Sequence, residues 1–238
     1  MIYAVVLIVA VLAAAEQAVT GFGAAIFMML FFSYFMPVTT AAALTGVMCL
    51  ASNVSNIILH WKHIQWKHLI LPVASYFVIS FLAIRLSMRI DTGWMKKIFG
   101  AVLILLSVYF LFVSKKIRVR PTAAASIICG SIAGVTGGLF GASAPPVVVY
   151  LAAATDTKER YLGTVQGFCL LTGLWSFGVR LFSGFYIVEL IPLILIGVAG
   201  VLAGQFIGTK VVHKISADVL RIAIYVMLAV SGVINLFT

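Results

Sequence analysis

Charged residues are scarce in this sequence. Only 9% of the 238 residues are Asp, Glu, Lys or Arg, and six of them are acidic. A soluble domain carries roughly 25% charged residues, and a chain that is 63% hydrophobic cannot be hidden in one core of this size. The composition therefore excludes an ordinary soluble domain and predicts an integral membrane protein. Its apolar segments are long and do not alternate as barrel strands do, which favours the all-α class.

Cysteine is also scarce, and motifs for cofactors are missing. The three cysteines lie in apolar segments without metal-type spacing, so we expect small core residues and no disulfide framework. They are Cys49, Cys129 and Cys169. The sequence has no P-loop pattern. We expect no cofactor, no metal site and no enzymatic activity.

The positive charge does not indicate a nucleic-acid partner. The formal net charge is +10, but the Lys and Arg residues lie mostly in short connections between apolar segments. This distribution is typical of membrane flanks. The partners expected are the lipid bilayer and a small anion, and a homodimer is an assembly that the sequence leaves open.

Eight hydrophobic segments follow one another along the chain, and the first and fifth are too long for one crossing. At about 1.5 Å per residue the first would span roughly 50 Å, against a hydrocarbon core of about 30 Å. The segments are 2–35, 38–59, 69–86, 94–113, 122–154, 161–182, 187–209 and 219–237.

Both long segments contain a glycine-rich interruption. One reads TGFGAA at 20–25, and the other reads GVTGGLFGASAPP at 134–146. Glycine and proline disfavour a regular helix, so we expect the backbone to open within 134–146. Segments 1 and 5 are then predicted to be re-entrant hairpins.

The second half repeats the plan of the first. Phe22 and Phe140 match at an offset of 118, and Cys49 and Cys169 match at an offset of 120. Growing offsets are what small loop insertions give, so we predict a duplicated unit of four segments. The domains expected are an N-terminal repeat at 1–114, a basic linker at 115–121 and a C-terminal repeat at 122–238.

The loop charges favour hairpins over full crossings. If all eight segments cross, the 16 Lys and Arg divide into seven and nine. If segments 1 and 5 fold back, the repeats are inverted and the same 16 residues divide into eleven and five. Basic connections stay cytoplasmic, so the hairpin model predicts a multi-pass membrane protein with both termini on the side away from the cytoplasm.

Two facing breaks predict an anion site. Helix N-termini at the breaks present free N–H groups, and glycine permits close approach of a ligand. Close helix packing is the alternative role for these glycines. The candidate substrate-binding residues are Thr20, Gly21, Phe22, Gly23, Asn53, Asn56, Thr136, Gly137, Gly138, Phe140, Gly141, Ser143, Gln166 and Arg180.

Two ionisable residues also have candidate roles. Glu16 lies one turn before the first break, where a desolvated carboxylate is suited to carry a proton; a residue reaching the interface is the alternative. Arg180 aligns with His60 at an offset of 120. Both attraction of an anion and a snorkelling membrane flank are consistent with that position.

The stretch GGLFGASAPPVVVYLA, the earlier TGFG and the duplicated plan resemble the sulfite-exporter family of the TauE/SafE type. Members often carry further glycines before the prolines, where this chain has Ser143 and Ala144. The resemblance implies an inner-membrane permease for sulfite, sulfonates or related anions, with proton coupling. We expect a secondary transporter; a passive anion channel and a membrane-embedded enzyme are the alternatives.

Overall fold

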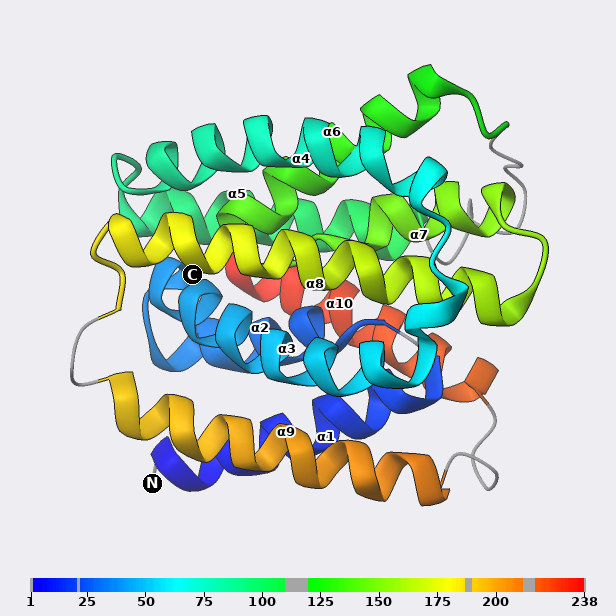
Figure 1. Ribbon diagram of the computed structural model, residues 1–238. Helices are drawn as coiled ribbons and strands as arrows, with labels where there is room; N and C mark the ends of the chain where they lie inside the picture. The colour runs from blue at the N-terminus through cyan, green and yellow to red at the C-terminus, as the bar shows by residue number, and fades with distance from the viewer. Residues whose placement is uncertain (1, 21, 110–119, 187–189, 212–216, 238) are drawn as a thin grey trace.

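The computed structural model describes residues 2–20, 22–109, 120–186, 190–211 and 217–237, and these residues form a helical bundle (Figure 1). No β-strand occurs in these ranges, so the all-α class is confirmed. The helices are α1 (Ile2–Thr20), α2 (Ala24–Phe35), α3 (Val38–His60), α4 (Trp66–Ser87), α5 (Thr92–Val108), α6 (Ala123–Phe140), α7 (Ala144–Ala154), α8 (Lys158–Phe182), α9 (Ile191–Val211) and α10 (Ala217–Phe237), with a 3₁₀ turn η1 at Trp61–His63.

Five helices are long and apolar enough to cross a membrane: α3, α4, α6, α8 and α9 within the described residues. Local sequence signals explain where several helices begin. Asp91 caps α5 by accepting a hydrogen bond from the Gly93 N–H at 2.8 Å, and Pro37 precedes α3, where its fixed φ suits a helix start. The multi-pass membrane class predicted from composition therefore corresponds to real helices.

The two longest apolar segments are each divided into two helices. α1 is followed by α2, which packs against it, and α6 is followed by α7 in the same way. In Figure 1 the chain reverses direction between the two members of each pair. Both breaks therefore lie inside the bundle.

The helices pack in a reciprocal pattern. α1 lies along α9 and α6 lies along α4, while α3 contacts α9 and α8 contacts α4. The fourth pair, α5 and α10, packs together, and α3 and α8 contact each other through the centre of the bundle. Elements in corresponding positions of the two halves thus make corresponding contacts.

Glycines allow the closest of these packings. A Cβ on Gly134 would lie 2.9 Å from Ile79 Cβ, and one on Gly138 would lie 2.7 Å from Ala83 Cβ, so α6 approaches α4 through a glycine face. Gly208 of α9 is equally close to α1, since its Cβ would lie 2.8 Å from Ala15 Cα. Small residues at such contacts are a general feature of membrane helix pairs.

The basic linker predicted at 115–121 and the domain boundaries beside it lie largely outside the described residues.

Candidate functional site

The break in the second half is shorter than its glycine content suggests. α6 continues through Gly134, Gly137 and Gly138 and ends at Phe140, so the opening expected within 134–146 is confirmed and is confined to residues 141–143. Gly141 ends the helix with φ 73°, and its N–H donates to the Gly137 carbonyl at 2.9 Å. Only glycine takes that left-handed conformation without strain.

α7 then begins at Ala144, with Pro145 and Pro146 in its first turn. Proline fits there because the first N–H groups of a helix have no partner within the helix. The break is therefore three residues long, and the prolines set the start of the second helix.

The break in the first half also depends on a glycine with positive φ. Gly23 has φ 119° and stands at the N-cap of α2. A Cβ at this position would lie 2.8 Å from Oε1 of Glu16, so the glycine also makes room for that carboxylate. Of the neighbouring candidates, Gly21 lies outside the described residues, as does the side chain of Thr20.

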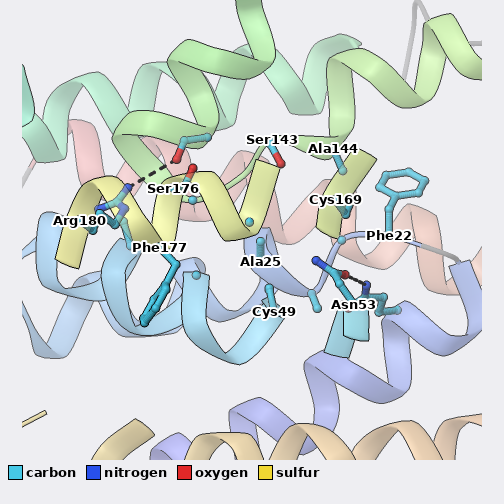
Figure 2. Close-up of a pocket in the computed structure, with 18 of the residues that line it drawn as sticks. Phe22, Ala25, Cys49, Asn53, Ser143, Ala144, Cys169, Ser176, Phe177 and Arg180 are labelled. Atoms are coloured by element: carbon cyan, nitrogen blue, oxygen red, sulfur yellow. Dashed lines mark hydrogen bonds between the residues drawn. The ribbon is translucent and has the colours of Figure 1, made fainter. Parts of the chain in front are cut away.

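The two breaks meet at a central cavity of about 60 Å³, shown in Figure 2. The first residues of α2 and α7 reach its wall, together with side chains from α3, α4 and α8. The lining residues are Gln17, Phe22, Gly23, Ala24, Ala25, Ala42, Gly46, Cys49, Asn53, Tyr76, Gly137, Gly141, Ser143, Ala144, Cys169, Gly173, Ser176, Phe177, Arg180 and Tyr186.

Arg180 stands at one end of this cavity (Figure 2). Its side chain is only 2% exposed. Nη2 donates to the Gly138 carbonyl at 2.6 Å and more weakly to the Gly137 carbonyl at 3.5 Å, whereas Nη1 is buried without a hydrogen-bond partner. The alternative of a snorkelling membrane flank is therefore wrong for Arg180.

Arg180 has no ion-pair partner among the described residues. Its guanidinium instead lies over the Phe185 ring, 5.5 Å from the centroid. Burying an unpaired charge is costly, and the carbonyls at the end of α6 compensate only one of its two terminal nitrogens. The other terminal nitrogen has no hydrogen-bond partner among the described residues.

Two tyrosines complete this end of the site. The hydroxyls of Tyr76 and Ser176 are hydrogen-bonded at 2.7 Å, and Tyr186 donates to the Ala43 carbonyl at 3.3 Å. Burial raises the pKa of Tyr186 to about 12, so its hydroxyl stays a donor at neutral pH. Sequence reasoning missed both tyrosines. Tyr186 stands at a segment end, where aromatic residues are usually interfacial, and Tyr76 lies in the middle of α4, where nothing in the sequence marks which way it points.

The opposite end of the cavity is closed by amide side chains. Gln17 Nε2 donates to Asn53 Oδ1 at 3.4 Å, and Ser52 Oγ donates to Gln17 Oε1 at 3.1 Å. The sequence interpretation also missed Gln17. Its amide side chain stands within an apolar helix, and this pattern could have been used to identify it as a candidate site residue. Cys49 and Cys169 pack against the two hydrophobic core clusters, as expected of core cysteines, and they also line the cavity.

Glu16 is buried beside the first break. It is 6% exposed, so the alternative in which it reaches the membrane interface is wrong. Its carboxylate packs against Gly23, close behind the wall of the central cavity. A carboxylate in this position is next to the ligand space without lining it.

The structure brings about half of the candidate residues to the central cavity: Phe22, Gly23, Asn53, Gly137, Gly141, Ser143 and Arg180. Thr136 is not among them, because its hydroxyl donates to the Ile132 and Ala133 carbonyls of its own helix. Phe140 packs on Phe99, with ring centroids 5.0 Å apart.

Gly138 reaches the cavity only indirectly, through its carbonyl bond to Arg180. Asn56 and Gln166 line a second cavity, next to the first. No group of three or more His, Cys, Asp or Glu side chains is placed to hold a metal ion in the part of the chain that the structure describes.

Comparisons with known proteins identify the family of this chain. Residues 6–234 match the sulfite exporter TauE/SafE family. A probable membrane transporter protein of Methanocaldococcus jannaschii is 31% identical over 191 residues, which cover 74% of this chain and 70% of the relative. No solved structure matches the chain. The chain belongs to the sulfite exporter TauE/SafE family of membrane transporters.

Proposed function

We propose that this protein is a secondary transporter of a small sulfur-containing anion, such as sulfite or an organosulfonate, and that the anion binds in the central cavity against Arg180. The observation that carries the proposal is the burial of a guanidinium whose Nη1 has no partner and which lines a cavity. An anion would supply the missing charge and the missing hydrogen bonds. The desolvation cost of Arg180 is then offset only when the substrate is bound.

Two helix N-termini support the same ligand. The cavity wall includes Ala24 and Ala25 of α2 and Ser143 and Ala144 at the start of α7. Neither N-terminus has a side-chain cap, so the first N–H groups of α2 and the positive ends of both helix dipoles are directed at the ligand space. At the start of α7, Pro145 and Pro146 have no N–H to donate, and the helix dipole is its main contribution. The Arg180 guanidinium and the N-termini of α2 and α7 thus all contribute positive potential to the cavity.

The cavity volume favours a small ligand. A water molecule needs about 10–15 Å³ of such space, so a cavity of about 60 Å³ holds on the order of four water-sized groups. This matches the three or four heavy atoms of a compact oxyanion. A longer organosulfonate would extend past Gln17 and Asn53, or would need the cavity to open.

Transport requires that the bound anion be exposed to one side at a time, and we propose that the two halves are inverted repeats that perform this exchange. The corresponding contacts of α1 with α9 and of α6 with α4 support this arrangement, and so does the reversal of the chain at each break (Figure 1). Transporters with broken helices commonly place the substrate where the repeats meet.

The connections support a topology with cytoplasmic basic loops. Figure 1 places the α3–α4 connection, the α7–α8 connection and the C-terminal ends of α5 and α9 at one end of the molecule. Lys62, Lys67, Lys158 and Arg160 belong to this end. We propose that this end faces the cytoplasm and that both termini face the periplasm of a bacterial inner membrane.

Glu16 is proposed to couple transport to protons. Its carboxylate packs against Gly23, whose neighbours form the cavity wall, so its charge would repel an anion in the site. Protonation of Glu16 removes this repulsion, and it therefore favours binding of the anion together with a proton.

Uptake into proteoliposomes tests this function. Radiolabelled sulfite or isethionate should accumulate above the external concentration when a pH gradient is imposed. Uptake that only equilibrates would show a passive channel instead. A thermal-shift screen with sulfite, sulfate, thiosulfate, taurine, isethionate and sulfoacetate identifies the ligand, and stabilisation by none of these anions would contradict the proposal.

A further inference from the structure

A second cavity adjoins the central one. It has a volume of about 350 Å³ and lies among α1, α3, α8 and α9, near the end of α3. We call it the vestibule. Its polar lining residues are Gln17, Ser55, Asn56, His60, Gln166 and Gln205, and its apolar ones are Ala18, Leu162, Leu202 and Phe206. Among the described residues, Asp, Glu, Lys and Arg are absent from this lining, which offers hydrogen bonds from amide, hydroxyl and imidazole groups.

Gln17 separates the two cavities, because it lines both of them. Its amide is held by the bond to Asn53 at 3.4 Å and by the bond from Ser52 at 3.1 Å. Ser52 is in turn fixed by Gln205, whose Nε2 donates to Ser52 Oγ at 2.8 Å. This amide cluster, defined as Gln17, Ser52, Asn53 and Gln205, joins α1, α3 and α9.

The weakest connection in the amide cluster is the one between the cavities. A separation of 3.4 Å is near the limit of a hydrogen bond, whereas 2.8 Å is close to the optimum. Rotation of the Gln17 side chain would therefore break the Asn53 contact first and leave the Ser52–Gln205 contact in place. The same rotation would free an amide N–H₂ group, which can donate to an anion.

We infer that the vestibule is a second binding site, for a partly hydrated small oxyanion, and that Gln17 is the gate through which this anion passes to Arg180. This inference rests on the proposed function. Amide, imidazole and hydroxyl groups replace part of the water around the anion without holding it tightly. Weak binding next to a tighter charged site is what passage through a pore requires.

The native cysteines of the central cavity provide the test. Cys49 and Cys169 lie in its wall beyond Gln17, whereas Cys129 lines neither cavity. The purified full-length protein is treated with sodium (2-sulfonatoethyl) methanethiosulfonate, a small sulfonate that modifies thiols. Peptide mass spectrometry then gives the labelling rate of each cysteine separately.

The gate predicts faster labelling of Cys49 in Gln17→Ala by about two- to tenfold, the effect of losing one neutral hydrogen bond, the one to Asn53. Gln17→Met keeps the side-chain volume and should give a rise of the same direction. Ser33→Ala is the matched control, because Ser33 lines neither cavity and its hydroxyl donates to the Leu30 carbonyl of its own helix. The Cys49 labelling rate in Ser33→Ala, and the Cys129 rate in all variants, should equal the wild-type rate.

Equal Cys49 labelling rates in the wild type and both Gln17 variants would overturn the inference, and so would an equal rise of this rate in Ser33→Ala. Protection of Cys49 by sulfate or isethionate tests the transport function separately. Protection without any effect of Gln17 would leave the function standing and remove the gate. A Gln17 effect without protection by any anion would support the path and contradict the ligand.

Discussion

Replacement of Arg180 by methionine removes the charge on which the proposed anion site depends. Methionine is similar in length and flexible, so it can fill the space beside Phe185 and Gly138. The variant loses the hydrogen bond to the Gly138 carbonyl but no longer buries an unpaired charge. Since these two effects oppose each other, we expect the thermal midpoint of the empty protein to stay within about 4 °C of the wild type, which is about 1 kcal/mol at this chain length.

The effect on the ligand is expected to be much larger. A hydrogen bond to a charged group contributes about 1.5–3 kcal/mol, so loss of the Nη1 contact should raise Kd by about 10- to 150-fold. At a ligand concentration of 100 times the wild-type Kd, binding stabilises the wild type by about 2.7 kcal/mol. A variant weakened about 100-fold would be stabilised by only about 0.4 kcal/mol at that concentration.

Thermal unfolding with and without the anion measures both effects. Arg180→Lys serves as the matched control, because it keeps the charge but loses the planar group that bonds two carbonyls and a ligand at once; its ligand-induced stabilisation should be intermediate. Equal stabilisation of Arg180→Met and the wild type by the same anion would refute the assignment of the site.

Three further predictions follow from the breaks and the residues beside them. Gly23→Ala should lower the free energy of unfolding by about 1–3 kcal/mol, because φ is 119° and the new Cβ meets Glu16. Gly178→Ala is the control: this glycine has open space around it, so the variant should be neutral or slightly stabilised in the same unfolding assay. Gly137→Ala should weaken anion binding, since its Cβ would lie 2.6 Å from the Tyr76 hydroxyl. Gly134→Ala should lower stability without changing Kd. Equal effects of the two substitutions on Kd would contradict the separate roles of Gly137 in the cavity and Gly134 in helix packing. Glu16→Gln should leave the protein inserted but reduce uptake driven by a pH gradient, and unchanged pH dependence would remove Glu16 from the mechanism.

The helical class and the position of the breaks could be predicted because their causes are local. An apolar composition indicates that the chain folds in a lipid bilayer. Glycine and proline disfavour a regular helix through their own backbone properties, whatever the tertiary structure. The exact limits of the second break could not be predicted, since Gly134 and Gly138 lie within α6 and serve its packing on α4. A glycine at a close helix contact and a glycine at a turn look alike in a single sequence.

The site could be predicted only in outline, because the direction of each side chain depends on tertiary contacts. Thr136 turned out to bond within its own helix, a choice open to any helical threonine. Tyr186 reaches the cavity from the connection after α8, which no local pattern indicates. Arg180 was identified through its repeat partner, but its burial follows from the approach of α8 to the end of α6.

The most direct test of the anion site is a crystal structure with selenite or selenate, whose selenium is located by anomalous scattering. The proposed function predicts selenium in the central cavity, with one of its oxygens within about 3 Å of an Arg180 guanidinium nitrogen. A saturated crystal with selenium only in the vestibule or on the surface, and none beside Arg180, would contradict it.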